Sequence, residues 1–341
     1  KELANNPLLL TLLCLEFEDS GNFPSDRADL YARATNTLLR KWDDKRYIYR
    51  QQIYKKLTPK RKEGLLSQIA FKTFDNKEYF FKQRTIERYI GEYICNLPNA
   101  PKEQTSLDID SQAVLKSIEG QHGLLVERAR GIYSFSHLTF QEYFTARKIA
   151  NISNPNQLEI ALINLANYVT EKRWREVFLL TATLLEPADR LLILMKRNID
   201  ELIAKEAKLQ KHLTLVNNKS NSVEANCKNS AIRACYFSLS LSKAIDKVSN
   251  EELLIILEKS KKLQQLLTLE TDSEPRDTII KIHSIPHEWN FNRQQRELLN
   301  QYLTANQLLV DCLNSECYIS RQVREEIENT LLLPFADLNY D

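Results

Sequence analysis

His137 is the residue whose type and position most invite a chemical role. It stands where an alternating, strand-like run from Tyr133 to Phe135 changes into a helix-like run that continues to Ala146. The N–H groups and the dipole of a helix start favour a phosphate, and an imidazole there can donate a hydrogen bond to it. The same position also suits a histidine that only caps the helix or is buried with its hydrogen bonds satisfied. The residues alone therefore leave two interpretations of His137 open.

No other residue pattern supplies catalytic partners for His137. The 341 residues contain no G-x-x-x-x-G-K-[ST] phosphate loop and no acidic Walker B strand in a parallel-sheet context, so this chain alone cannot hydrolyse ATP. The spacing indicates no Ser-His-Asp, Cys-His or paired-carboxylate set either. We expect no catalytic residue in this chain.

The histidines and cysteines near the end of the chain raise the question of a metal site. His283, His287, Cys312 and Cys317 do not have the spacing of a recognised zinc finger, and His287 lacks the second histidine of an H-E-x-x-H motif. None of the six cysteines forms a C-x-x-C pair. We expect no metal ligand and reduced thiols.

Short strands and a helix frame His137. Leu124 to Val126 and Gly131 to Phe135 are expected strands, joined at a turn in which Gly131 can take the positive φ that a tight hairpin requires. After His137, the sequence Thr139-x-x-Glu142 has the pattern of a capping box. The pattern predicts a helix whose first turn is fixed by Thr139.

The residues before this hairpin predict a winged-helix domain. Helical patterns at 59–74, 84–95 and 110–119 surround one strand-like segment at 78–81, and the hairpin and a final helix follow. The helix before the hairpin would be the reader of a DNA major groove. Its residues 108–119 contain three acids and one lysine, which would repel phosphate and argue against DNA recognition.

Helical patterns also fill both ends of the chain. Pro7 suits the first turn of a leucine-rich helix, and a second, amphipathic helix follows through Trp42. Beyond Asn151 we expect only helices, in pairs: 157–169, 174–185, 189–212, 230–247, 250–269, 292–313 and 320–332. The predicted fold class is therefore mainly α: a small helical unit (1–45), a winged-helix domain with a short β-hairpin (46–150), and an all-α domain of paired helices (151–341).

Composition and charge narrow the class of protein further. With 43% hydrophobic and 27% charged residues, the chain can bury two or three modest cores. The 47 basic and 45 acidic residues nearly cancel, so no global charge favours nucleic acid or a membrane surface. Apolar runs are too short to span a bilayer and no signal peptide is evident, so we expect a cytoplasmic chain. Basic stretches at 43–57 and 205–219 leave nucleic-acid binding as a secondary alternative.

Three motifs resemble those of NACHT-type signalling NTPases, a branch of the STAND class of P-loop ATPases. Tyr133 to Ala146 resembles the F-x-H-x-x-x-Q-E-F-x-A signature that closes their winged-helix domain. Asn6 to Leu10 resembles the G-x-P-type motif of their first helical domain, and Arg173 to Leu180 resembles the W-x-E-V motif that follows the winged helix. The end of the chain resembles the C-terminal helical domains of cyanobacterial NACHT proteins.

The resemblance implies a role for one residue of each motif. His137 would contact the β-phosphate of bound ADP in the resting state, and Pro7 would pack on the adenine ring. Trp174 would pack the helical domain onto the winged helix and transmit its movement. ADP or ATP, with Mg²⁺, would be held by the full-length protein and not strongly by this chain alone.

The resemblance also implies partners and a setting. The chain would be the regulatory part of a longer protein, since Lys1 is no initiating methionine. Its partners would be an NTPase core upstream in the same chain and, on activation, further copies, with phage defence in bacteria as the setting and an unknown trigger. A helical scaffold with a winged-helix interaction module and no nucleotide role stays open as the alternative.

Overall fold

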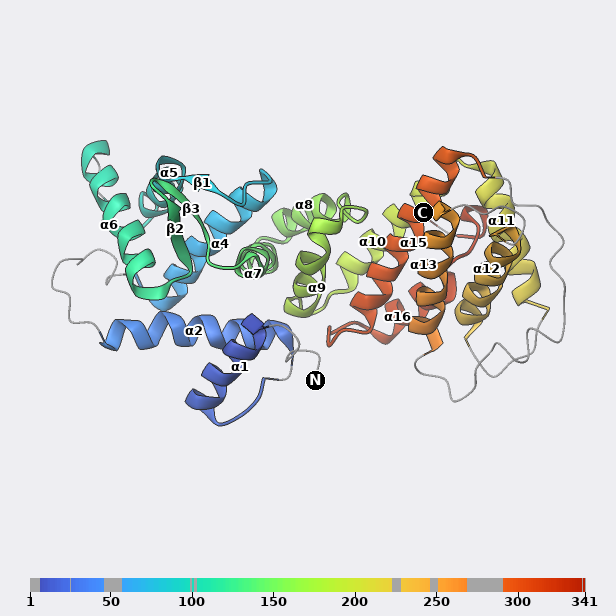
Figure 1. The fold of residues 1–341 in the computed structure, drawn as a ribbon, viewed down its shortest axis with the longest axis horizontal. Coiled ribbons are helices and arrows are strands. Elements are labelled where there is room, and N and C mark those ends of the chain that lie inside the picture. Colours follow the sequence, from blue (N-terminus) through green and yellow to red (C-terminus); the bar gives the residue numbers. More distant parts are fainter. Residues whose placement is uncertain are drawn as a thin grey trace. The chain divides into compact units, whose positions relative to one another are not determined.

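The computed structural model describes residues 7–24, 26–45, 57–98, 100, 103–222, 228–245, 251–268, 291–338 and 340. The chain forms two compact units (Figure 1). Unit 1 comprises residues 1–158 and 176–184, and unit 2 comprises residues 159–175 and 185–341. Among the described residues, no helix is both long and apolar enough to cross a membrane. The fold is mainly α, as the sequence predicts.

Unit 1 combines helices with one small sheet. Its elements in chain order are α1 (Pro7–Ser20), α2 (Arg27–Lys45), α4 (Pro59–Asp75), β1 (Phe81–Lys82), α5 (Gln83–Ile94), α6 (Gln104–His122), β2 (Leu125–Ala129), β3 (Ile132–Phe135) and α7 (Leu138–Ala150). The order from α4 onward, helix, strand, two helices, hairpin, helix, is that of a winged helix. The predicted hairpin is confirmed, with Gly131 at φ +70° in its turn.

The sheet of unit 1 is antiparallel, in the order β1-β3-β2. Tyr133 at the centre of β3 pairs with Phe81 on one side and Glu127 on the other. The strand predicted at 78–81 is wrong in extent, because only Phe81 and Lys82 pair with β3. Glu78 still belongs to the turn that ends α4, since its N–H donates to the carbonyl of Thr73 at 2.8 Å.

The helices of unit 1 close around a core of aliphatic and aromatic side chains. α7 packs along α4, α5 packs against α6, and α2 contacts α4, α6 and α7. Thr58 caps α4, and Asp26 accepts a hydrogen bond from the N–H of Asp29 (2.8 Å) at the start of α2. α6 begins at Gln104, one to two turns before the predicted start, and Gln104 supports the added turn by donating to Asp108 (2.8 Å) four residues later.

Unit 2 is helical throughout its described part. The elements from residue 155 onward are α8 (Pro155–Ala166), η2 (Lys172–Trp174), α9 (Arg175–Leu184), α10 (Asp189–Ile203), α11 (Ala207–Ser220), α12 (Asn229–Ile245), α13 (Glu251–Thr268), α15 (Arg293–Leu313), α16 (Arg321–Thr330) and η3 (Phe335–Asp337). α9 after its first residue belongs to unit 1, and the division also runs through α8.

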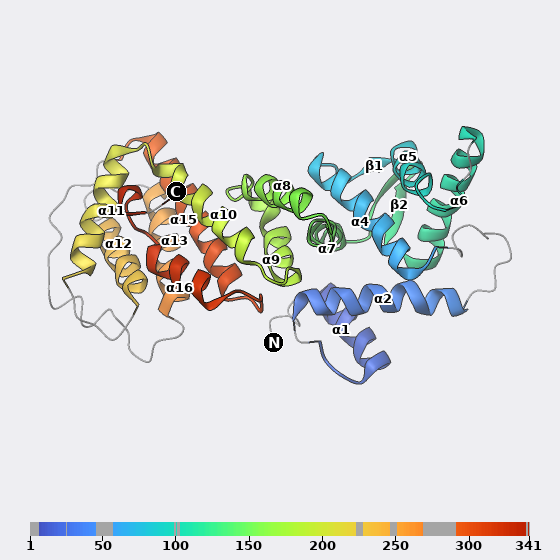
Figure 2. The same cartoon turned by 180° about the vertical axis from the view of Figure 1, so that it is seen from behind.

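Five helices of unit 2 lie side by side in an order that differs from their order in the chain. α11 neighbours α12, α12 neighbours α13, α13 neighbours α15, and α15 neighbours α10 (Figures 1 and 2). α15 therefore lies between helices that come before it in the sequence. The single helix predicted at 189–212 is wrong, because α10 ends at Ile203 and α11 starts at Ala207. Gln210 of α11 donates to the carbonyl of Ile203 (2.9 Å), which gives this helix end a hydrogen-bond partner.

Candidate functional site

His137 is the N-cap of α7, with an extended backbone (φ −142°, ψ 145°) that joins β3 to the helix. Its Nδ1 accepts a hydrogen bond from the backbone N–H of Thr139 at 3.3 Å and also contacts the Thr139 hydroxyl. The predicted capping box is therefore wrong in detail, because Thr139 is already inside the helix and His137 takes the capping role. The prediction that His137 stands at the start of the helix is confirmed.

The cap decides which nitrogen of His137 carries the proton. Because Nδ1 accepts from a backbone N–H, the proton of the neutral ring is on Nε2. The side chain is exposed, and none of the described residues makes a hydrogen bond with Nε2. The N-terminus of α7 adds the positive end of a helix dipole. A capping histidine and a hydrogen-bond donor for an anion are thus compatible roles for one ring.

Two polar residues further along α7 fix the helix that carries His137. Gln141 is buried, and its amide donates to the hydroxyl of Thr73 (2.8 Å) and to the carbonyl of Glu78 (3.0 Å). Arg147 forms an ion pair with Glu63 of α4. These bonds join α7 to both ends of α4 and to the segment before β1, so α7, which begins next to His137, is fixed at several points.

Glu142 faces a second cluster, made with α2 and α9. Only 8% of Glu142 is exposed, and no described residue forms a hydrogen bond or ion pair with its carboxyl group. Burial, with a further contribution from the nearby Glu176 carboxylate, raises the pKa of Glu142 to about 7. Glu176 itself is paired with Arg27 at 3.3 Å. Burial also raises the pKa of the neighbouring Tyr31 to about 12.

The sequence interpretation missed Gln141 and Glu142 as positioning and titrating residues. Two polar side chains inside the apolar run Phe140 to Phe144 were the available signal, since such residues are rarely buried without a partner or a purpose. The interpretation assigned Glu142 to helix capping instead.

The other two candidate residues are placed only in part. Pro7 is the first residue of α1, as predicted, but its side chain lies outside the described residues, so an adenine contact stays a prediction. Trp174 belongs to unit 2 and is 1% exposed. Its ring stacks on the ring of Tyr168, with 4.5 Å between the two centroids. The guanidinium of Arg173 lies 5.0 Å from the centroid of the Trp174 ring. Its role in packing one domain on another also stays a prediction.

Comparison with known families agrees with this geometry. Residues 27–149 match the model described as "Winged helix-turn-helix domain C-terminal to NACHT", and residues 250–334 match "NACHT C-terminal Helical domain 2". The chain carries two C-terminal domains of NACHT proteins. The first match runs from the start of α2 to the end of α7, and the second covers α13, α15 and α16. No curated protein and no solved structure matches the chain significantly.

The helix of the NACHT winged helix that would read DNA offers no free basic face. Lys116 is the one lysine or arginine of α6, and it already binds Glu119 (3.0 Å), Glu127 (3.5 Å) and the hydroxyl of Tyr133 (2.8 Å). These contacts raise its pKa and hold the ammonium on the protein. Large side chains exposed on this helix include Ile109, which is 67% exposed and cannot contact phosphate.

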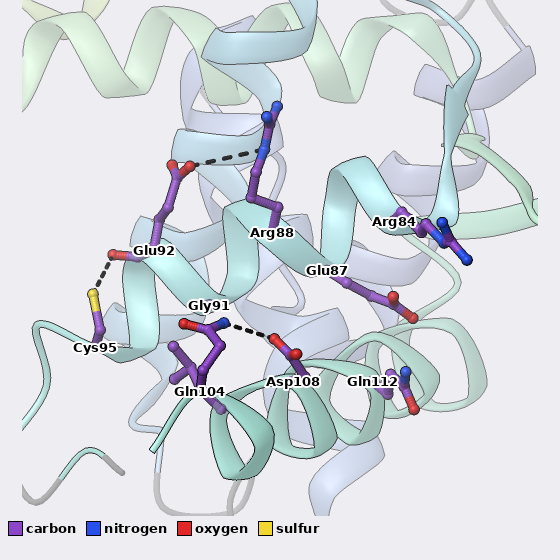
Figure 3. A pocket seen from close by; sticks show the side chains of 10 residues that line it. Arg84, Glu87, Arg88, Gly91, Glu92, Cys95, Gln104, Asp108 and Gln112 are labelled. Atoms are coloured by element: carbon purple, nitrogen blue, oxygen red, sulfur yellow. Dashed lines mark hydrogen bonds and ion pairs between the residues drawn. The ribbon is translucent and has the colours of Figure 1, made fainter. Parts of the chain in front are cut away.

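A groove of about 590 Å³ lies between α5 and α6 of the winged helix (Figure 3). Two pairs of its lining residues interact with each other: Figure 3 shows Arg88 turned towards Glu92 (3.9 Å) and Gln104 towards Asp108 (2.8 Å). Lys72 binds Glu92 as well. The groove is thus of mixed charge, and it lacks the unbroken basic lining that a nucleic-acid backbone requires.

The described residues contain no group of three or more histidine, cysteine or acidic side chains that could hold a metal ion. Cys312 is buried, and the thiol of Cys317 donates to its carbonyl oxygen at 3.1 Å. His283 and His287 lie outside the described residues. The two cysteines therefore lie next to each other at the end of α15.

Proposed function

We propose that this chain is the regulatory, autoinhibitory part of a NACHT NTPase, in which it helps to hold ADP in the resting state and relays activation. The observation that carries the proposal is the exposed Nε2–H of His137 at the start of α7, on a winged helix of the NACHT type. A neutral imidazole donor at the positive end of a helix fits a phosphate oxygen. The buried bonds of Gln141 fix this donor in place.

The rest of the proposal concerns the protein to which the chain belongs. An NTPase core upstream in the same chain would supply the phosphate loop and Mg²⁺, Pro7 would contact the adenine ring, and Trp174 would couple the helical domain to the winged helix. Loss of the His137 contact would favour exchange of ADP for ATP and assembly with other copies. We place this switch in the cytoplasm and, in bacteria, in defence against phage.

The test uses the full-length protein and two substitutions of His137. His137→Leu removes both the cap and the donor, whereas His137→Asn keeps a good N-cap and removes only the imidazole. A charge-assisted hydrogen bond contributes about 1.5–3 kcal/mol, so both variants should bind ADP about ten- to 150-fold more weakly and show a higher basal activity. ADP affinity is measured by calorimetry, and retained nucleotide by chromatography after denaturation.

The two variants separate the proposed role from its alternatives. If only His137→Leu weakens ADP binding, the histidine acts as a cap and contacts no phosphate. If both variants bind ADP and rest as the unchanged protein does, the nucleotide role is wrong and the chain is a helical scaffold with a winged-helix interaction module.

A further inference from the structure

Lys259 of α13 is a partly buried cation that faces only neutral oxygen atoms. Its Nζ donates to Asn300 Oδ1 at 2.5 Å and to Thr304 Oγ1 at 2.6 Å. The four-residue spacing of Asn300 and Thr304 places both on the face of α15 that meets α13. The amide of Gln307, a further turn along this face, donates to the carbonyl of Lys259 (2.5 Å). These bonds fix the position of Lys259 between the two helices.

No carboxylate of the described residues balances this charge. Neither Lys259 nor Lys172 of η2 has an ion-pair partner within the described part of the chain, and burial together with the nearby charge of Lys172 lowers the pKa of Lys259. Partly buried ammonium groups are normally paired with an anion, because a desolvated charge is costly. Lys172 is exposed to solvent, whereas Lys259 is partly buried, so Lys259 is the cation whose charge a negatively charged ligand would balance.

A small groove lies between the same two helices, which lie side by side in Figures 1 and 2, and Asn300, the partner of Lys259, is one of its lining residues. It has a volume of about 220 Å³ and is lined by Ile255, Ile256, Arg293, Arg296, Glu297 and Asn300. Because an ammonium can only donate, Asn300 must turn its oxygen to Lys259 and has its amide N–H₂ left to donate elsewhere. Asn300 is therefore the link between the lysine and the groove.

The groove carries an excess of positive charge, which favours an anionic ligand, and it has an apolar wall. Arg293 and Arg296 come from the first turn of the 21-residue helix α15, whose dipole adds positive charge there. Arg296 also donates to the carbonyl of Phe291 (2.6 Å), so Arg293 is the guanidinium with the greater freedom to meet a ligand. Glu297 is the one acidic residue among the six that line the groove. Ile255 and Ile256 supply apolar surface on the side of α13.

We propose that the groove between α13 and α15, with Lys259, Asn300 and Arg293, binds a small phosphate monoester. A phosphate carries a charge of about −1.5 to −2 at pH 7 and accepts several hydrogen bonds, so it matches the excess of cations better than a single carboxylate does. The groove is smaller than the ~300–1,000 Å³ typical of sites for drug-sized ligands, so the carbon part must be small. This site belongs to unit 2 and is independent of the role proposed for His137.

The test is a calorimetric titration of the chain with inorganic phosphate and with glycerol 3-phosphate at constant ionic strength, with glycerol and acetate as comparison ligands. We expect both phosphates to bind, glycerol 3-phosphate more tightly, and neither glycerol nor acetate to bind comparably. Lys259→Met should weaken binding by about tenfold or more, because it removes the positive charge behind Asn300 and the bond that orients the Asn300 amide. Lys261→Met, an exposed lysine of the same helix, is the matched control and should bind as the unchanged chain does.

A second variant keeps the test valid if Lys259→Met folds poorly. Arg293 is exposed, so Arg293→Gln should leave the fold intact and still weaken binding of glycerol 3-phosphate severalfold. Absence of phosphate binding, equal affinity in Arg293→Gln and Lys261→Met, or acetate binding as tight as that of phosphate would each overturn the proposal.

Discussion

Glu142 makes the stability of unit 1 depend on pH, with a sign opposite to that of an ion-paired carboxylate. Its pKa rises from 4.5 to about 7 in the folded chain because the carboxyl is buried and Glu176 is near. The folded state therefore binds a proton more tightly than the unfolded state. Both states are protonated below pH 4.5, so the stability that Glu142 contributes is full there and is lost as the pH rises through about 7.

The size of the effect follows from the two pKa values. Each tenfold difference in proton affinity is worth about 1.4 kcal/mol, so ionised Glu142 destabilises the folded state by about 3 kcal/mol above pH 8. Glu142→Gln replaces the carboxyl with a neutral group of the same shape. The variant should match the unchanged chain near pH 4.5 and exceed its free energy of unfolding by up to about 3 kcal/mol at pH 8.

Urea denaturation of the 341-residue chain at pH 5, 6, 7 and 8 provides the assay. Glu176→Gln should reduce the slope without abolishing it, because burial, the larger cause of the raised pKa, remains. Glu103→Gln, at an exposed position, is the control and should follow the unchanged chain. Parallel curves for the unchanged chain and Glu142→Gln across this range would refute the argument.

Two further predictions concern unit 2. Trp174→Ala should lower the free energy of unfolding of unit 2 by about 3–5 kcal/mol, because the ring is buried and stacked on Tyr168. The control is Tyr318→Ala, at an exposed position, which should change this free energy little. Urea denaturation compares the two variants. Lys196→Met should lower the free energy of unfolding by about 3–5 kcal/mol, because Asp200 stays buried without its ion-pair partner. The double variant Lys196→Met/Asp200→Asn should recover much of that loss in the same assay. Equal stability of the single and the double variant would contradict this prediction.

The elements of the fold that depend on residues close together in the sequence could be predicted from it. Gly131 in the hairpin turn and Ser320 at the start of α16 act through local backbone chemistry, and the structure has them where the pattern indicates. The break after Ile203 could not be predicted, because the apolar pattern continues across it. Gln210, which donates to that helix end, also accepts a hydrogen bond from the N–H of Phe335 (2.7 Å), and Phe335 meets α11 only in the folded chain.

The same distinction applies to the candidate site. His137 was recognisable because the change of period from strand to helix marks its place in the sequence. Its capping bond gives His137 the role that the capping-box pattern predicted for Thr139, since the geometry of the strand end decides which side chain reaches the orphan N–H. Glu142 was not recognisable as a titrating group, because its burial depends on α2 and α9, which are far away in the sequence.

The arrangement of α7 joins an exposed donor and a costly buried carboxylate on one short helix. His137 stands at its first turn, while Glu142, five residues on, lies against Tyr31 of α2 and near Glu176 of α9. Because ionisation of Glu142 costs about 3 kcal/mol only while it is buried, any displacement of α2 or α9 that admitted water would release that energy at neutral pH. Coupling energies between sites are commonly about 1–3 kcal/mol, so this one carboxyl group is sufficient to bias a two-state element. The stability of the packing of α7, the helix that presents His137, therefore depends on whether α2 and α9 keep Glu142 buried.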